Sequence, residues 1–379
     1  MPKKVVIIGG GVGGTIVANA LAGSTKPENA EVTLISESAK HVYQPSFISV
    51  ALGHEKPDSI IHGEQNLLSE KIKFINETAS KIDPMNRQVV TEKGTTADYD
   101  YLVVSAGARY SPEQIPGYEK TAHHFYDVKH SLKLREALAQ FTGGKILIGV
   151  GSVPYKCPPA PLEFTFLLDE YLKNKGMRNV AEIEYFYPIN GVFTIAAVEP
   201  MLAKLLEERE ISYHVFFNTE SVDPEKKIVS SMEGDTLHYD LLVMTPPHRG
   251  AKVVEDSGLG DNGGWLPTDR FTLKAKGYDD IYGIGDCTDL PVSKSGSAAH
   301  FQSKIVAESI ASRIFNEGEG LIKYDGHVEC FLETGFGKGI TLNFNYERPP
   351  KPSTPNRIAH WEKELFNRLY WSTVPKARV

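Results

Sequence analysis

This chain of 379 residues has few cysteines, no long apolar run and no net positive charge. Three cysteines, Cys157, Cys287 and Cys330, are too few for a disulfide-stabilised scaffold, and we expect them to be redox-active, catalytic or buried. No apolar run reaches about 18 residues, which excludes a transmembrane helix. Acidic residues outnumber Lys and Arg by 48 to 41, so the chain lacks the basic field that nucleic acid binding requires. The composition favours a multi-domain globular protein that does not bind nucleic acid.

Short apolar runs alternate with glycine-containing turns and helical stretches, which indicates an α/β fold. The N-terminus enters the first of these runs directly, at Val5, and we expect no cleavable leader before it. Continuous apolar runs are typical of parallel strands that are buried on both faces. The main expected strands lie at residues 5–8, 31–35, 101–105, 145–151, 182–187, 212–217 and 238–244.

We predict two Rossmann-like dinucleotide-binding domains, with the second inserted in the first. Residues 281–286 are expected to form a strand that rejoins the first sheet, so that the first domain is discontinuous. The first domain is predicted to comprise residues 1–112 and 245–320, and the second residues 113–244. Residues 321–379 form a C-terminal region that is expected to end in an amphipathic helix.

The turn after the first strand has the spacing Gly9-x-Gly11-x-x-Gly14 and opens a predicted helix, which is the context of a dinucleotide-binding motif. The first glycine permits the tight turn, the second lets a pyrophosphate approach the backbone, and the third lets the helix pack closely on the strand. Ser36 and Glu37 end the next strand, about 20 residues further on, where a carboxylate binds ribose hydroxyls in such folds. The sequence therefore predicts a bound dinucleotide.

Two further segments favour FAD over NAD. Gly285-Asp286 ends a predicted strand just before a helix, where two-dinucleotide flavoproteins use an Asp to hold the ribityl chain of FAD. The N-terminus of that helix can stabilise a reduced, anionic flavin. Ala106-Gly107 resembles the Ala-Thr-Gly-type turn of the same flavoproteins. The remaining candidate FAD contacts are Pro45 and Lys294, of which the lysine could also be a solvated loop residue.

The corresponding turn of the second unit lacks a third glycine. Gly149 and Gly151 are followed by Pro154, Cys157 and a further pair of prolines. Prolines remove backbone N–H donors, so this turn is poorly suited to binding a pyrophosphate. We therefore expect that the electron donor is not a nicotinamide.

Residues 155–163, with the sequence Tyr-Lys-Cys-Pro-Pro-Ala-Pro-Leu-Glu, resemble the active-site loop of flavocytochrome c sulfide dehydrogenase flavoprotein subunits. These subunits group with the sulfide:quinone oxidoreductases among the disulfide-reductase flavoproteins. Residues 285–302 resemble the second flavin-contact segment of that group, and residues 329–331 the segment that supplies a second redox cysteine. The resemblance spans residues 3–345 and implies FAD as cofactor, sulfide as substrate and a quinone acceptor.

Cys157 and Cys330 are then expected to form a redox-active disulfide. HS⁻ can attack such a disulfide, which leaves a persulfide on one cysteine and a thiolate on the other. Glu163, early on the predicted helix, could shuttle a proton from hydrogen sulfide, although an ordinary helix-entry carboxylate would look the same. Cys287 is interpreted as a packing residue. The competing interpretation is that Cys157 and Cys330 are two separate buried thiols.

The last predicted helix begins near Pro355, with Thr354 as its N-cap, and combines an apolar face with basic flanks. Its expected apolar residues are Ile358, Trp361, Leu365, Phe366, Leu369, Tyr370 and Trp371. From residue 348 to the end, seven Lys or Arg stand against two Glu. This pattern favours binding to an anionic lipid surface. A helix that closes the protein's own core, or that forms a dimer contact, is the alternative.

The sequence as a whole predicts a sulfide:quinone oxidoreductase that is peripheral to the cytoplasmic side of the cell membrane, with a homo-oligomer as a further option. No metal site is expected, and no Cys-x-x-Cys-His motif for c-type haem occurs. The alternatives are a type II NADH:quinone oxidoreductase and a non-catalytic FAD-binding assembly protein.

Overall fold

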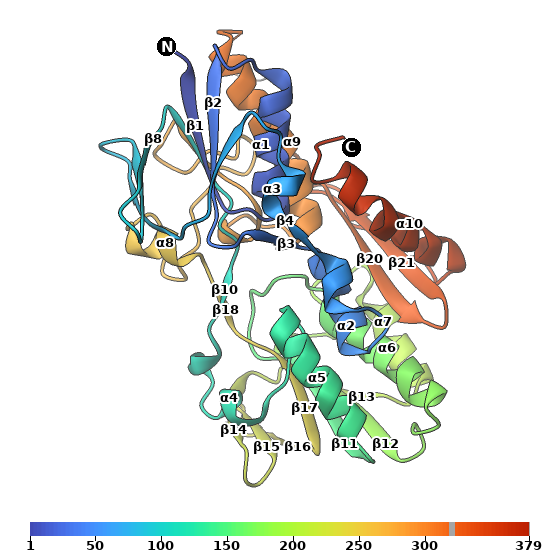
Figure 1. Cartoon of the computed structure of the whole chain (residues 1–379). Coiled ribbons are helices and arrows are strands. Elements are labelled where there is room, and N and C mark those ends of the chain that lie inside the picture. Colours follow the sequence, from blue (N-terminus) through green and yellow to red (C-terminus); the bar gives the residue numbers. More distant parts are fainter. Residues whose placement is uncertain (318–322, 379) are drawn as a thin grey trace.

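The computed structural model describes residues 1–317 and 323–378 and contains a parallel sheet in each half of the molecule (Figure 1). The first sheet has the strand order β19-β9-β1-β2-β5. Its strands are β1 (Lys3–Ile8), β2 (Ala30–Ile35), β5 (Ile72–Ile75), β9 (Tyr101–Val104) and β19 (Ile281–Gly283). β19 comes from much later in the chain than its neighbours and pairs in parallel with β9.

Both faces of the first sheet are covered, which explains its continuous apolar runs. On one face α1 (Val12–Ser24) and α9 (Gly296–Ile314) pack against each other and bury Ile7 in the core. On the other face Val6 and Val104 share a core with Val89 of a small antiparallel sheet. The elements of that face are β6 (Ala79–Asp83), β7 (Gln88–Thr91), β8 (Thr96–Asp98) and α8 (Lys252–Asp256).

The second sheet has the parallel order β13-β12-β11-β17. Its strands are β11 (Gly144–Val150), β12 (Ala181–Phe186), β13 (Ser212–His214) and β17 (Leu241–Thr245). The helices of this half are α4 (Tyr118–Thr121), α5 (Val128–Gln140), α6 (Ala160–Asn174) and α7 (Glu199–Glu208), with an antiparallel sheet of β14 (Thr219–Asp223), β15 (Ile228–Ser231) and β16 (Thr236–His238). α6 starts three residues after Cys157, so the predicted redox loop lies between β11 and α6.

The chain crosses between the two halves twice, at adjacent positions. β10 (Arg109–Tyr110) leads out of the first half and β18 (His248–Arg249) leads back. The two segments pair in an antiparallel ribbon, with Tyr110 opposite His248 (Figure 1). Short elements in the first half are β3 (Lys40–Val42), β4 (Ile61–Gly63), α2 (Phe47–Ala51) and α3 (Glu64–Leu67).

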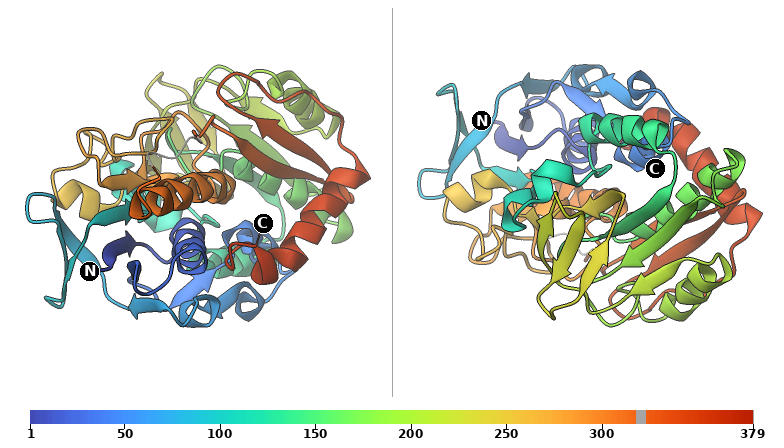
Figure 2. Two further views of the ribbon diagram at one scale, coloured as in Figure 1. Left: turned by 90° about the horizontal axis from the view of Figure 1, so that it is seen from above. Right: turned by 90° about the horizontal axis from the view of Figure 1, so that it is seen from below.

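The C-terminal region lies over both halves. β20 (Val328–Gly335) and β21 (Lys338–Phe344) form an antiparallel hairpin, and α10 (Arg357–Thr373) packs on both strands. β20 also packs against α6, which brings the tail to the predicted redox loop. α10 runs along the outside of the molecule, and its C-terminal end lies beside α1 (Figure 2).

The start of α10 differs from the expectation. Its N-cap is Asn356, whose side-chain Oδ1 accepts a hydrogen bond from the N–H of Ala359 at 3.0 Å. Thr354 lies two residues earlier, outside the helix. Asn and Thr both cap helices well, and Asn356 stands at the position where the backbone turns helical.

α10 exposes most of the predicted apolar face. Ile358, Trp361 and Leu365 have exposed fractions of 66%, 64% and 57%. Tyr370 and Trp371 do not extend this face, contrary to the expectation: Tyr370 is buried against Tyr43, and the ring of Trp371 stacks on His62 at 3.9 Å. No helix in the described part of the chain is long and apolar enough to cross a membrane.

The predicted α/β architecture, with an inserted second Rossmann-like domain and a closing helix, is confirmed. Two expected strands have other limits. Residues 212–217 are extended only to His214, because Phe216 adopts a left-handed φ of 55°. Residues 238–244 divide between the end of β16 and β17. The domain limits stay predictions, and the limit at residues 320/321 lies outside the described residues.

Candidate active site

The Gly-rich turn between β1 and α1 has no room for side chains at its first and third glycines. Gly9 has a φ of +105°, and a Cβ there would lie 2.2 Å from the carbonyl O of Ser105. A Cβ on Gly14 would lie 2.0 Å from the carbonyl O of Gly9. Gly11 has nothing within 4 Å of a Cβ, so its backbone faces open space. This is the arrangement that lets a pyrophosphate approach the N-terminus of α1.

Ser36 and Glu37 follow β2 beside this turn. Ser36 is buried, its Oγ donates to the carbonyl O of Ser38 at 3.0 Å, and it stands next to Gly10. Glu37 is exposed, as a carboxylate that binds ribose hydroxyls from the edge of the site would be. Both residues therefore lie where the sequence pattern predicts them, although the Ser36 hydroxyl already donates a hydrogen bond within the protein.

Asp286 gives the clearest indication that a polar ligand binds in the interior of the protein. Its Oδ1 is buried and has no hydrogen-bond partner among the described residues, and the same is true of Nε2 of Gln302. The Oε1 of Gln302 accepts from the N–H of Gly285 at 2.7 Å, which holds the amide next to Asp286. Unpaired buried polar atoms are rare, and a ligand that carries hydroxyl and carbonyl groups, such as FAD, would satisfy both. The described residues thus fit FAD.

Two buried lysines flank Asp286. Lys294 donates to the carbonyl O of Thr288 at 2.5 Å and lies 3.8 Å from the ring centroid of Trp265, and burial lowers its pKa. Lys156 donates to Gln44 at 3.1 Å and forms no ion pair with a described carboxylate. Burial alone would lower the pKa of Lys156, but Tyr110 and Asp286 outweigh it and the pKa is raised. Two buried cations close to one carboxylate suit an anionic ligand group.

Lys156 was missed by the sequence analysis, although it directly precedes Cys157. Its backbone bridges to Lys294, so one short segment carries both the lysine and the cysteine into the site. Pro45 follows Gln44, the hydrogen-bond partner of Lys156, in the turn Gln44–Ser46. The remaining predicted contacts, Ala106 and Gly107, follow β9, and Gly107 has a φ of +69°.

Cys157 and Cys330 meet at the junction of the second half and the C-terminal hairpin. Both are partly buried, both pack against the core of the second half, and both carry free thiols. Cys157 adopts a left-handed φ of 56°, and its N–H donates to the carbonyl O of Lys294 at 2.6 Å. A left-handed backbone on a non-glycine residue is a local strain that often marks a functional position. The charge of Cys330 acts on Cys157, so the two predicted cysteines lie within electrostatic range of each other.

Deprotonation of either cysteine thiol is unfavourable at this site. Burial raises the pKa of Cys157 far above its usual range, and the charges of Cys330 and Glu163 add to this effect. Burial likewise raises the pKa of Cys330 to about 12. Lys363 acts in the opposite direction on both thiols. The reduced pair is therefore a neutral dithiol at neutral pH, and Lys363 is the charge that favours a thiolate.

Glu163 lies next to the cysteines in the first turn of α6, but it is not a free carboxylate. The ammonium of Lys363 donates to its Oε1, and the side chains of Lys363 and Glu163 are only 13% and 8% exposed. Its Oε2 accepts from the N–H of Glu333 at 3.3 Å. The sequence analysis had counted Lys363 only among the basic flanks of α10. Its spacing of three from His360 places both residues on one face of the helix, and the contacts with Glu163 and Glu333 show that this face points inward.

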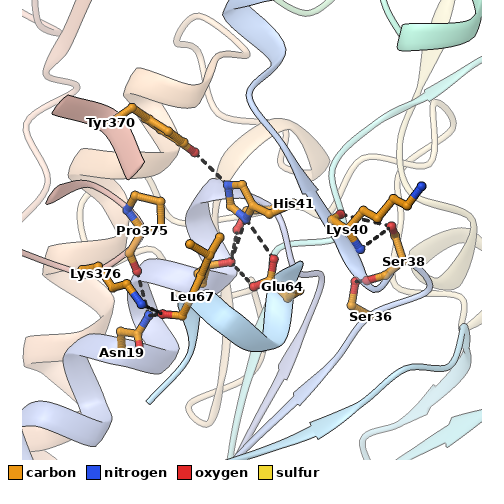
Figure 3. Close-up of polar contacts among 12 residues, drawn as sticks. Asn19, Ser36, Ser38, Lys40, His41, Glu64, Leu67, Tyr370, Pro375 and Lys376 are labelled. Carbon is orange, nitrogen blue, oxygen red and sulfur yellow. Dashed lines mark hydrogen bonds and ion pairs between the residues drawn. The ribbon is translucent and has the colours of Figure 1, made fainter. Parts of the chain in front are cut away.

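A buried polar chain fixes the end of α10 to the Gly-rich turn (Figure 3). The hydroxyl of Tyr370 hydrogen-bonds Nε2 of His41 at 2.8 Å, and Nδ1 of His41 lies 2.9 Å from Glu64. Thr15, in the first turn of α1, donates to the other oxygen of Glu64 at 2.6 Å. Nothing in the apolar periodicity of the sequence predicts this series of hydrogen bonds, because its residues lie in four separate elements.

Cys287 has the packing role that was expected for it. It is fully buried, and its Sγ donates to the carbonyl oxygens of Ile284 and Val104 at 3.2 and 3.3 Å. Burial raises its pKa to about 11. A thiol with such contacts is held in the core of the first half.

A family model described as pyridine nucleotide-disulphide oxidoreductase matches residues 3–307. The chain belongs to this family. Among similar proteins, the mitochondrial sulfide:quinone oxidoreductase of Mus musculus is 28% identical over 388 residues, which cover 97% of this chain and 85% of the relative. The type II NADH:quinone oxidoreductase of Staphylococcus aureus (strain MSSA476) is 23% identical over 393 residues, which cover 97% of this chain and 94% of the relative.

The X-ray structure of the sulfide:quinone oxidoreductase from the hyperthermophilic bacterium Aquifex aeolicus is similar, with a TM-score of 0.88 and 25% identity. The match covers 99% of this chain and 92% of that chain. Membership of the pyridine nucleotide-disulphide oxidoreductase family and these similarities confirm that the chain is an FAD-dependent oxidoreductase.

Proposed function

We propose that this chain is a sulfide:quinone oxidoreductase, which oxidises sulfide to sulfane sulfur and reduces a membrane quinone. The observation that supports the proposal is that Cys157 and Cys330 are both partly buried and that the charges of Cys330, Glu163 and Asp286 all act on Cys157. The similarity to sulfide:quinone oxidoreductases along nearly the whole chain supports it.

The cysteine pair is proposed to cycle between a disulfide and a persulfide. HS⁻ attacks one sulfur of the disulfide, the S–S bond breaks, and a persulfide and a thiolate result. Release of sulfane sulfur re-forms the disulfide and yields two electrons and the proton that HS⁻ brought in. FAD, when bound, takes up these two electrons and supplies them to the quinone. The overall balance is HS⁻ + H⁺ + quinone → S⁰ + quinol.

We expect Lys363 to stabilise the thiolate and Glu163 to accept a proton in this cycle. A thiolate released in this site is destabilised by burial, as the raised pKa of both cysteines indicates. The ammonium of Lys363 offsets part of that penalty. Glu163 accepts the proton when neutral hydrogen sulfide rather than HS⁻ enters, because its carboxylate acts electrostatically on Cys157 and is ion-paired with Lys363.

The exposed face of α10 is proposed to rest on the cytoplasmic surface of the membrane, where quinone dissolves. Trp361 and Leu365 are more than half exposed, and Arg357 and Arg368 are exposed on the same helix. An apolar face with basic neighbours binds the boundary between lipid headgroups and acyl chains. Lys363 projects from the inner side of α10 toward the cysteine pair, so the same helix would contact both the membrane and the redox site.

The turn of the second half argues against a nicotinamide donor. A Cβ on Gly149 would lie 2.2 Å from the ring of Phe186, and one on Gly151 would lie 2.8 Å from Ile115. Side chains of the protein therefore occupy the space around both glycines, in contrast to Gly11 of the first turn. Pro158 and Pro159 then precede α6 and remove N–H donors.

A stopped-flow experiment tests the proposal against a type II NADH:quinone oxidoreductase. We expect sulfide to bleach the flavin absorbance of the purified holoenzyme rapidly and NADH to leave it unchanged. Bleaching by NADH and not by sulfide would contradict the proposal, and no bleaching by either donor would favour the non-catalytic FAD-binding protein.

A further inference from the structure

The inner side of α10 carries a second ionisable pair beside the Lys363–Glu163 pair. Nδ1 of His360 lies 2.9 Å from Oε2 of Glu333, and His360 and Lys363 are one helical turn apart. Glu333 is on β20, three residues after Cys330, and its N–H donates to Glu163. The two pairs therefore form one cluster that joins α10, β20 and α6 next to the cysteines.

The cluster runs from the surface into the interior. The side chain of His360 is 30% exposed, that of Glu333 is 10% exposed, and that of Glu163 is 8% exposed. The ionisable neighbours of Glu333 are Lys363 and His360 from α10 and Glu163 from α6. Solvent can therefore reach one end of the cluster, and the other end borders Cys157.

The charges of the cluster suit proton transfer. Burial raises the pKa of Glu333 in spite of the opposing effects of Lys363 and His360, so this carboxylate takes up a proton more readily than an exposed one. Burial alone would lower the pKa of Lys363, but attraction to Glu163 and Glu333 outweighs it. One ammonium is thus attracted by two carboxylates, Glu163 and Glu333.

We propose that His360 and Glu333 conduct a proton from water to the redox site, by way of Lys363 and Glu163. This proton is consumed when quinone is reduced. The inference rests on the proposed function, because a quinone that accepts two electrons requires two protons and HS⁻ supplies only one. The second proton enters from solvent at His360, passes to the carboxylate of Glu333, and leaves the cluster to the quinol oxygen. Histidine suits the entry position because it exchanges protons near neutral pH.

The test uses the oxidative half-reaction alone, so that it does not depend on sulfide. Holoenzyme is reduced with dithionite, mixed with a water-soluble quinone in a stopped-flow instrument, and followed by flavin absorbance and by a pH-indicator dye. We expect His360→Gln and Glu333→Gln to slow proton uptake and flavin reoxidation by about 10²-fold at neutral pH. Imidazole in the buffer is expected to restore the rate in His360→Gly.

His214→Gln is the matched control. His214, with its side chain 40% exposed, pairs with buried Glu184 in the second half, so the variant loses an equivalent His–Glu pair that has no part in the proposed proton path. We expect the control to retain the wild-type rate and its pH dependence. The proposal is overturned if His360→Gln takes up protons at the wild-type rate, or if its rate has the wild-type pH dependence. If quinone does not reoxidise the reduced wild-type enzyme either, the proposed function itself fails.

Discussion

Lys363 in the last helix forms a buried ion pair with Glu163 at the start of α6, 200 positions earlier in the chain. This pair links the exposed helix to the helix that follows the Cys157 loop. Because Lys363 also favours the thiolate forms of both cysteines, the C-terminal helix is part of the redox site as well as a cover for it.

Removal of Lys363 tests this link through stability. We expect Lys363→Met to lower the free energy of unfolding by about 3 kcal/mol, because it leaves the carboxylate of Glu163 buried without its counter-charge. The double variant Glu163→Leu/Lys363→Met should recover most of this loss. Urea-induced unfolding measures both. Lys204→Met, which breaks an exposed pair with Glu208, is the control and should change stability little; an equally small effect of Lys363→Met would contradict the account.

The ionisation of Cys330 gives a pH-dependent prediction. Its pKa is raised to about 12, so the thiolate fraction of the reduced enzyme is small at neutral pH and grows with increasing pH. The rate of alkylation by iodoacetamide should therefore rise about tenfold per pH unit between roughly pH 7 and 9.5, without a plateau. Lys363→Met should slow the reaction further. Mass spectrometry of the Cys330 peptide follows the rate, and a plateau below about pH 8.5 would show that the thiol is not suppressed.

Lys156 should set the reduction potential of bound FAD. Its ammonium is buried, forms no ion pair with a carboxylate in the described part of the chain, and is under the electrostatic influence of Asp286. We therefore expect it to stabilise negative charge that arrives in the site on reduction. Lys156→Met should lower the two-electron midpoint potential by tens of millivolts, where about 30 mV corresponds to about 1.4 kcal/mol. Spectroelectrochemical titration measures this shift. The exposed Lys226→Met should leave the potential unchanged, and an unchanged potential in Lys156→Met would remove the lysine from the cofactor site.

The exposed face of α10 should bind lipid. Sedimentation with vesicles that contain anionic phosphatidylglycerol measures the partition of the protein. We expect Trp361→Glu/Leu365→Glu to weaken it by about tenfold or more, because each change removes a large apolar side chain from the contact. Met232→Glu is matched in exposure, at 72%, and lies in the second half, so it should bind as the wild type does. Equal binding of all three proteins would place the membrane contact elsewhere.

The fold and the dinucleotide turn could be predicted because their signals are local. Gly9, Gly11 and Gly14 each have a separate steric or contact reason within a few residues of sequence, and buried parallel strands appear as apolar runs. The cap of α10 was misplaced by two residues, since Thr354 and Asn356 are both good caps and only the backbone decides between them. The strand at residues 212–217 was too long because a left-handed φ at Phe216 has no sequence signature.

The charged part of the site could not be predicted in the same way. Cys157 and Cys330 were paired only through a resemblance to known enzymes, because no spacing rule connects residues so far apart. Lys363, Glu333 and His360 become one cluster only when α10 packs on β20 and α6. Tyr370 and Trp371 continue the apolar periodicity of α10, but partners on the first half, His41 and His62, turn them inward.

The central claim is tested most directly by sulfide-dependent quinone reduction in wild type, Cys157→Ser and Cys287→Ser. Cys287→Ser is the control, since Cys287 lies in the core of the first half and serine keeps its hydrogen bonds. The account predicts that Cys287→Ser retains the wild-type rate and that Cys157→Ser falls to the background rate with FAD still bound. Undiminished turnover in Cys157→Ser would contradict it.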